Sequence, residues 1–360
     1  MSTSPATFLF KNGNILPAAD TPPISTFLAT HPGAYTTTRT HDNGRILLFY
    51  DRHLKRLSNS LLILLNTNPS LIFGPQFSSK FFMPPSSNWD FILRNRVSEE
   101  MRVSLPVALS ERGFGKELAV SALIGGNVGE LRGRIDSEVI DRIFDVYVHI
   151  GMYVPPVFGV AGNGARLAVV GNRRDFAEAK YSDWARLRKP LENLRPPSAT
   201  ELLLSDDDGR ILEGTITNFF VVCSKLQGNS DIKEEKSHDE DSLHSYELQT
   251  ASVNAGVLPG IIRQLVLEIC LSNGITVREV SPSWLERGNW EEAFITNSLR
   301  LVQHVESIQA PTSLASMESK SWEDVSWSEK QFKARPGVVT SLIQREIMKK
   351  ADVEGHSLAV

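Results

Sequence analysis

The sequence has little cysteine: 360 residues contain only Cys223 and Cys270, and both lie among apolar neighbours. Two thiols cannot form a disulfide framework, so we expect buried, reduced cysteines in a cytoplasmic protein. No run of eighteen or more apolar residues is present, which excludes a helix that spans a membrane. Residues 1–17 lack the charged and apolar segments of a secretory signal and the Arg-rich character of a transit peptide. These absences predict no membrane partner.

An excess of positive charge is also lacking. Lys and Arg number 38 against 42 Asp and Glu, and no basic stripe is visible, so nucleic acid is not a predicted partner. The eight histidines show no His-x-x-x-His spacing and the cysteines no Cys-x-x-Cys, so no metal site is predicted. The glycine-rich stretch 125–129 does not fit a dinucleotide fingerprint, and a Gly-x-Ser-x-Gly nucleophile elbow is missing.

The length and a hydrophobic share of 41% suit two globular domains, or one large α/β domain with insertions. Four glycines together with Pro155 and Pro156 fall within residues 151–164, where we place the domain junction. The predicted domains are therefore 1–157 and 158–360. Residues 225–247 are dense in charged and polar side chains, and we expect a disordered acidic insertion there.

Hydrophobic periodicity and turn residues predict the individual elements. In the first half we expect strands at 46–50 and 146–153, helices at 52–65 and 136–144, and a loop at 66–88. In the second half we expect strands at 167–171, 201–205, 210–222 and 293–296, a hairpin turn at 206–209, a helix opened by Pro259-Gly260, a loop at 310–323, and a helical region at 328–350.

The most informative motif is Leu212-Glu213-Gly214-Thr215-Ile216-Thr217-Asn218-Phe219-Phe220. It resembles the Glu-Gly-x-x-x-Asn-x-Phe signature of fold-type IV (class IV) enzymes that use pyridoxal 5′-phosphate (PLP). This family includes branched-chain and D-amino-acid aminotransferases and aminodeoxychorismate lyase. The resemblance implies that Glu213 lies against the pyridine nitrogen of the cofactor and that Asn218 belongs to the same site. A carboxylate there keeps the ring nitrogen protonated, so that the ring accepts electrons from a substrate carbanion.

The family also needs a lysine that forms a Schiff base with the cofactor. Lys180 lies 33 positions before Glu213, close to the separation usual in the family, and the resemblance makes it the catalytic residue. Lys189, 24 positions before Glu213 and next to Pro190, is the weaker candidate. Such an amine must be partly neutral to attack an aldehyde, and burial beside a cationic cofactor lowers the pKa of an amine.

Two further segments resemble the phosphate-binding parts of the family. Residues 51–60 are similar to the His-x-x-Arg-Leu-x-x-Ser helix, which assigns Arg56 to the cofactor phosphate, a task that suits the guanidinium fork. Residues 258–263 are similar to Leu-x-Gly-Ile-Thr-Arg, where the backbone amides of Ile261 and Ile262 would bind phosphate at a helix start. Ile262 replaces the usual threonine, and the hydroxyl of Ser298 is expected to supply part of what is lost.

The segment Pro32-Gly33-Ala34-Tyr35-Thr36-Thr37-Thr38-Arg39 resembles the Gly-x-Phe/Tyr-x-x-x-Arg strand that faces the substrate. It implies substrate contacts from Tyr35 and Arg39, although a buried strand tyrosine is the competing interpretation. The Thr-Thr pair is closer to aminodeoxychorismate lyase than to branched-chain aminotransferases. An Arg-Gly followed by Arg-x-His, the carboxylate trap of D-amino-acid aminotransferases, is missing.

The resemblance extends over about residues 29–308 and implies an α/β (α+β) two-domain fold of fold-type IV. A smaller N-terminal domain and a larger C-terminal domain would hold PLP in the cleft between them. The implied function is an aminotransferase for an amino acid and a 2-oxo acid, working as a homodimer. Two alternatives stay open: aminodeoxychorismate lyase, which forms 4-aminobenzoate and pyruvate, and a non-catalytic binding protein that keeps the fold.

Overall fold

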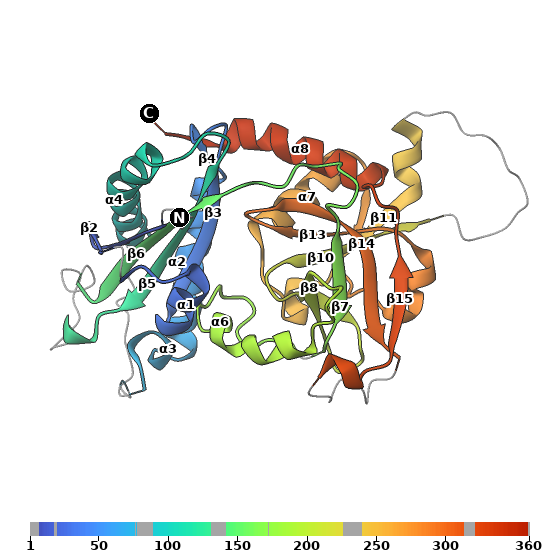
Figure 1. Ribbon diagram of the computed structural model, residues 1–360, viewed down its shortest axis with the longest axis horizontal. Coiled ribbons are helices and arrows are strands. Elements are labelled where there is room, and N and C mark those ends of the chain that lie inside the picture. Colours follow the sequence, from blue (N-terminus) through green and yellow to red (C-terminus); the bar gives the residue numbers. More distant parts are fainter. Residues whose placement is uncertain are drawn as a thin grey trace, which may run out of the picture. The chain divides into compact units, whose positions relative to one another are not determined.

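The computed structural model describes residues 7–17, 20–75, 77, 89–130, 142–171, 173–225, 240–312 and 321–358 (Figure 1). The chain divides into two compact units. The first unit comprises Met1–Pro155, Phe176–Leu187 and Ala351–Val360, and the second comprises Pro156–Asp175 and Arg188–Lys350. The sequence placed every residue after 157 in one domain, whereas residues 176–187, with Lys180 among them, pack in the first unit.

The first unit is built on a seven-stranded antiparallel sheet. In spatial order its strands are β16 (His356–Ser357), β4 (Ile46–Leu47), β3 (Gly33–His41), β5 (Glu117–Gly126), β6 (Phe144–Tyr153), β1 (Thr7–Lys11) and β2 (Asn14–Ile15). Alternate side chains of these strands enter two different cores, as expected from the period of two in a strand. Ala34 of β3 joins the core beneath α2 (Tyr50–Thr67) and α4 (Trp89–Ser110), and Tyr35 joins the core with α1 (Ile24–Thr30) and α6 (Trp184–Leu187).

The second unit is a nine-stranded sheet that closes on itself. The strands on its main path are β12 (Thr276–Arg278), β11 (Tyr246–Gln249), β10 (Asn218–Ser224), β13 (Trp290–Asn297), β14 (Leu301–Pro311), β7 (Ala165–Val169), β8 (Glu201–Ser205) and β9 (Ile211–Gly214). β9 also pairs with β10 through Glu213 and Asn218, which closes six strands into a ring. Phe219 and Ile295 point into the ring, whereas Phe220 and Phe294 stack on the opposite face.

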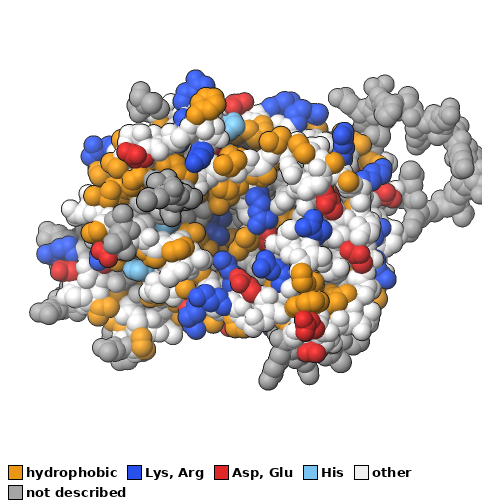
Figure 2. All heavy atoms as spheres, viewed as in Figure 1, with side chains coloured by type: hydrophobic (Ala, Val, Ile, Leu, Met, Phe, Trp, Pro, Cys, Tyr) orange, Lys and Arg blue, Asp and Glu red, His pale blue; other side chains and the backbone are white. Residues whose placement is uncertain are grey.

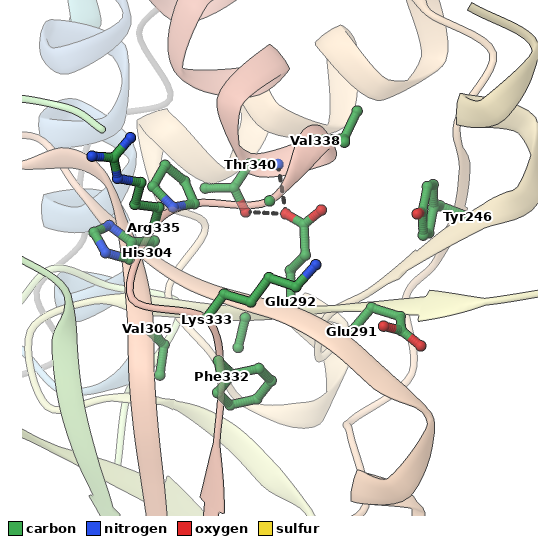
Figure 3. A pocket seen from close by; sticks show the side chains of 13 residues that line it. Tyr246, Glu291, Glu292, His304, Val305, Phe332, Lys333, Arg335, Val338 and Thr340 are labelled. Carbon is green, nitrogen blue, oxygen red and sulfur yellow. Dashed lines mark hydrogen bonds between the residues drawn. The ribbon is translucent and has the colours of Figure 1, made fainter. Parts of the chain in front are cut away.

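Two helices of the second unit contact β13. α7 (Ile261–Ser272) packs against β13 and β12, and α8 (Val338–Glu354) begins at a carboxylate supplied by β13. Glu292 accepts hydrogen bonds from the backbone N–H groups of Val339 (3.0 Å) and Thr340 (2.9 Å) and from the Thr340 hydroxyl (2.6 Å). Figure 3 shows the two bonds from Thr340. A carboxylate at a helix N-terminus satisfies unpaired N–H groups and interacts favourably with the helix dipole.

Several sequence predictions are confirmed by these elements. The helix at 52–65 is the central part of α2, and the strand at 146–153 is most of β6. The hairpin turn at 206–209 joins β8 to β9, where the Gly209 N–H donates to the Asp206 carbonyl. The helix opened by Pro259-Gly260 is α7, which begins at Ile261.

Other predictions were wrong in part. The strand at 46–50 stops at Leu47, because Phe49 adopts a left-handed conformation (φ 50°) that starts α2 at Tyr50. The single strand at 210–222 is two strands, β9 and β10, separated by a turn in which the Gly214 N–H donates to the Thr217 carbonyl. Residues 328–331 are not helical but form part of β15 (Trp327–Gln331), which pairs with β14; the helix α8 follows after Pro336.

The predicted loops and insertion also need correction where they are described. The loop at 66–88 contains the short helix α3 (Ser70–Phe73), whose buried Ile72 and Phe73 enter the first core. Phe144 begins β6 rather than ending a helix, and residues 136–141 lie outside the described residues. Within the predicted insertion 225–247, residues 226–239 lie outside the described residues, Glu240–Ser245 form a 3₁₀ helix and Tyr246 begins β11.

The surface carries both signs of charge. On the face drawn in Figure 2, Lys and Arg side chains are interspersed with Asp, Glu and apolar side chains. Among the described residues, every helix is too short or too polar to span a lipid bilayer.

Candidate functional site

Lys180 is held at the edge of the first unit's sheet by its backbone. Its carbonyl accepts a hydrogen bond from the Tyr35 N–H (2.9 Å), and its own N–H donates to the Ser60 hydroxyl of α2 (3.1 Å). The next residue, Tyr181, forms an antiparallel bridge with Ala34 of β3. The Lys180 ammonium lies 4.7 Å from the centre of the Tyr35 ring. The backbone of this lysine is therefore fixed, while its amine projects over an aromatic face.

Arg56 belongs to a buried hydrogen-bonded cluster on the opposite face of β3. Its Nη2 donates to the Thr36 hydroxyl (2.8 Å), which lies 2.8 Å from Nδ1 of His53. The Thr36 hydroxyl therefore links the guanidinium of Arg56 to the imidazole of His53. Burial, and next the charges of Arg56 and Lys180, hold the pKa of His53 well below its usual value. His53 is therefore a neutral partner that helps to fix the guanidinium of Arg56.

Tyr35 and Arg39, the predicted substrate residues, are both buried in the first unit. Tyr35 is 8% exposed and packs with Phe27 and Leu28 of α1. Arg39 is 4% exposed, its Nη1 donates to the Thr40 carbonyl (3.0 Å), and burial lowers the pKa of its guanidinium. These contacts suit the interpretation of Tyr35 as a buried strand tyrosine, and substrate contacts by either residue stay predictions.

Glu213 is turned towards the loop before α7 by a β-bulge. The pairing between β8 and β9 shifts register between Leu203–Gly214 and Ser205–Ile211. A bulge lets consecutive side chains face the same way, and here Leu212 packs with Ala251 and Val257 while Glu213 accepts a hydrogen bond from the Leu258 N–H (2.9 Å). The Glu213 side chain is only 3% exposed.

Asn218 joins this carboxylate to the start of α7. Its Nδ2 donates to the Leu258 carbonyl (2.8 Å) and, over a longer distance of 3.4 Å, to Glu213 Oε2. Its Oδ1 lies against Gly260, where a side chain would overlap it. Gly260 is the N-cap of α7, and among the described residues no side chain caps this helix. The first amides of α7, Ile261 and Ile262 included, are thus without a side-chain acceptor there, which is the arrangement that binds phosphate groups.

Ser298 directly follows β13 and is half-buried. Two residues earlier, Thr296 stands next to Asn218 in the register of β10 and β13. The Thr296 hydroxyl is buried and makes no hydrogen bond to the described residues. A phosphate contact by Ser298 stays a prediction.

Arg174 is the site residue that sequence analysis missed. Its Nε lies 2.8 Å from Glu213 Oε1, and the two side chains are 8% and 3% exposed. The Arg-Arg pair at 173–174, one residue after the apolar strand predicted at 167–171, was the only sequence signal, and it belongs to no motif. The structure thus brings together Glu213, Asn218, Arg174 and the start of α7 in the second unit, and Lys180, Tyr35 and the cluster of Arg56 in the first.

Three cavities formed by described residues are lined by none of the predicted site residues. The cavity at the start of α8 (Figure 3) measures about 90 Å³, well below the volume of sites for small molecules, and Glu292 serves there as a helix cap. In the first unit, cavities of about 500 and 430 Å³ lie along α4 and are lined by none of the predicted site residues.

Comparison with known proteins found one family model and several similar solved structures. Residues 164–308 match the family model described as amino-transferase class IV. The structure resembles the branched-chain aminotransferase of the thermophilic archaeon Thermoproteus uzoniensis, at 18% identity and a TM-score of 0.58 over 96% of this chain and 95% of that one. It also resembles the Escherichia coli branched-chain amino acid aminotransferase, at 17% identity and a TM-score of 0.58 over 97% and 95% of the two chains.

A third similar structure is the T.th. branched-chain amino acid aminotransferase complexed with N-(5′-phosphopyridoxyl)-L-glutamate, at 17% identity and a TM-score of 0.59 over 96% and 94% of the chains. No curated protein matches the sequence. The fold is that of the class IV aminotransferases, and the resemblance drawn from the sequence is confirmed for residues 164–308 and for the fold. The predicted two-domain α/β architecture is confirmed with it.

Proposed function

We propose that this chain is a PLP-dependent aminotransferase that moves an amino group between an amino acid and a 2-oxo acid. Lys180 would carry the cofactor, with Arg56, Glu213, Asn218, Ser298 and the amides of Ile261 and Ile262 as its binding groups. The match of residues 164–308 to the class IV family supports this assignment, because the segment contains Lys180 and all of these groups except Arg56.

One observation carries the proposal: the buried carboxylate of Glu213 lies close to the uncapped start of α7. The three residues Leu258, Pro259 and Gly260 connect the two, because the first binds Glu213 and the last precedes the helix. The Leu258 N–H donates to Glu213, and the chain then passes through Pro259 and Gly260 into α7. The two ends of this arrangement suit opposite charges, since a carboxylate attracts a cationic ring nitrogen and helix N–H groups attract a phosphate. PLP carries both groups on one small ring, so the residues present fit it.

When bound, the cofactor supplies an electron-accepting ring that stabilises negative charge on the substrate α-carbon. The protein's own groups do the rest. The amine of Lys180 would hold the cofactor covalently through its aldehyde, and as a free amine it would take up and return a proton at the substrate α-carbon. Thr36, which also contacts His53, fixes the position of the Arg56 guanidinium before the cofactor binds. Arg56 would therefore neutralise the charge of the phosphate without a change in its own conformation.

The test is reduction of the purified holoenzyme with borohydride, which makes an existing lysine–cofactor link permanent. We expect loss of the yellow colour and a mass label on the peptide that contains Lys180. Lys180→Ala should abolish the label, whereas Lys189→Ala, at an exposed lysine nine positions later, should retain it. A label on another lysine, or no bound cofactor at all, would contradict the proposal and favour the non-catalytic alternative.

Substrate assays separate the remaining alternatives. The proposed enzyme requires a 2-oxo acid acceptor for turnover, and a screen of amino donors against several acceptors identifies the pair. Release of pyruvate from aminodeoxychorismate without any acceptor would identify the lyase instead. A homodimer and a cytoplasmic location stay predictions; light scattering of the holoenzyme tests the first.

A further inference from the structure

Arg174 forms an ion pair with Glu213 that has no role yet in the proposed function. The contact joins Arg174 Nε to Glu213 Oε1 at 2.8 Å, and both side chains are more than nine-tenths buried. The other carboxylate oxygen accepts from the Leu258 N–H and Asn218 Nδ2. One guanidinium charge and two hydrogen-bond donors therefore converge on one carboxylate; the contact with Arg174 is an ion pair without hydrogen-bond geometry.

Burying a carboxylate without compensating charge is costly, and such a group takes up a proton instead. The positive charge of Arg174 supplies the compensation in the second unit itself, whether or not a ligand is present. Arginine suits this position because its guanidinium keeps its charge in an apolar environment better than an ammonium does.

The position of Arg174 also decides where a shared proton resides. When a pyridine nitrogen is bound to Glu213, one proton lies either on the ring nitrogen or on the carboxylate. A proton on the carboxylate is nearer to the guanidinium than a proton on the ring, and two positive charges repel more strongly at the shorter distance. The guanidinium therefore drives the proton from Glu213 onto the ring.

We propose that Arg174 is a positioning residue that keeps Glu213 ionised and thereby keeps the ring nitrogen of the bound cofactor protonated. Arg174 touches neither the reacting atoms nor the substrate in this scheme; it acts through Glu213. This inference rests on the proposed function, since it assumes that Glu213 binds the ring nitrogen.

The experiment measures the protonation of the ring directly, by ¹⁵N NMR of the enzyme loaded with ring-¹⁵N PLP. In the wild type we expect the resonance of a protonated pyridine through the neutral pH range. In Arg174→Met the ratio of protonated to unprotonated ring should fall by about tenfold or more, because the charge that favours the ring position is gone. Arg174→Lys should restore much of the ratio. Arg173→Met is the matched control: Arg173 is the exposed neighbour, and the spectrum should stay that of the wild type.

The outcomes are distinguishable from a failure of the proposed function. A wild type that does not bind PLP at Lys180 contradicts the function. A wild type that binds PLP, together with an Arg174→Met variant whose ring stays protonated, overturns the role of Arg174. If Arg174→Met does not accumulate as folded protein, Arg174→Lys and Arg174→Gln are compared; equal ring protonation in these two would also refute the charge argument.

Discussion

A methyl group at Gly260 tests the contact between the start of α7 and Asn218. Gly260 has φ −66° and ψ 143°, which any residue adopts, so Gly260→Ala introduces no backbone strain. The new Cβ would overlap Oδ1 of Asn218, whose side chain is buried and hydrogen-bonded to Leu258 and Glu213. Asn218 must therefore rotate, and its hydrogen bonds are lost or lengthened.

The expected loss of stability follows from these contacts. A buried amide left without its partner costs about 1–3 kcal/mol, and an added methyl group in a tightly packed place costs about 1–3 kcal/mol. Replacing glycine by alanine stiffens the unfolded chain, which returns about 0.4–1 kcal/mol. We therefore expect Gly260→Ala to lower the free energy of unfolding by about 2–4 kcal/mol. Binding of PLP should weaken with it, because Asn218 supports Glu213.

The assay is equilibrium unfolding of the cofactor-free chain in urea, followed by tryptophan fluorescence. Gly288→Ala is the control, because no atom lies within 4 Å of the Cβ position at that glycine, and its effect should stay within about 0.5 kcal/mol. The double variant Gly260→Ala/Asn218→Ala should be less destabilised than the sum of the single variants, since the clash is gone. Equal costs of Gly260→Ala with and without Asn218 would refute the reasoning.

Two further predictions concern Glu292 and His53. Glu292→Ala removes the cap that binds the Val339 N–H and the N–H and hydroxyl of Thr340, and should lower the free energy of unfolding in urea by about 1–2 kcal/mol. Glu291→Ala, at the exposed neighbour, should lower it far less. Equal losses in the two variants would rule out the cap. For His53, the folded chain lowers the pKa below the unfolded value of about 6.5. The unfolded chain therefore binds the extra proton, and stability should fall as pH drops through about 6.5, by up to about 1.4 kcal/mol per pH unit. His53→Gln should remove this component of the slope of unfolding free energy against pH, and an unchanged slope would contradict it.

The elements that carry motifs were predictable from the sequence because their signals are local. The hairpin turn at 206–209 uses Asp and Gly, whose conformational preferences act within a few residues. α7 has apolar residues on one face and Gly260 directly before its first residue, so its start followed from periodicity and capping rules.

The longest missed element is α4, and its sequence explains why. Apolar residues occur all round this helix: Leu93 and Val97 are buried while Phe91 and Val107 are exposed, so no one-sided pattern marks it. Pro106 lies inside the helix, although proline usually ends one. The division of residues 210–222 into two strands was missed because the turn between them contains Thr215, Ile216 and Thr217. These β-branched residues are typical of strands, so the sequence pattern continues through the turn.

The candidate site was predictable as a set of residue types but not as a set of contacts. The resemblance of residues 212–220 to the family signature gave Glu213 and Asn218. The ion pair with Arg174 joins residues 39 positions apart in sequence, through strands whose pairing no local pattern reveals. Likewise, the engagement of Arg56 by Thr36 depends on how α2 packs on β3.

A single residue pair, Glu213 with Asn218, joins β9 to β10 and completes the circle of strands in the second unit. Those two side chains also make up the proposed ring-nitrogen end of the coenzyme site. Closure of the strand ring and binding of the coenzyme thus involve the same two residues. Amino-acid replacements at either position are therefore constrained both by folding and by coenzyme binding. A coenzyme bound to Glu213 would also stabilise the pairing of β9 with β10. Binding of the coenzyme and closure of the strand ring would then reinforce each other.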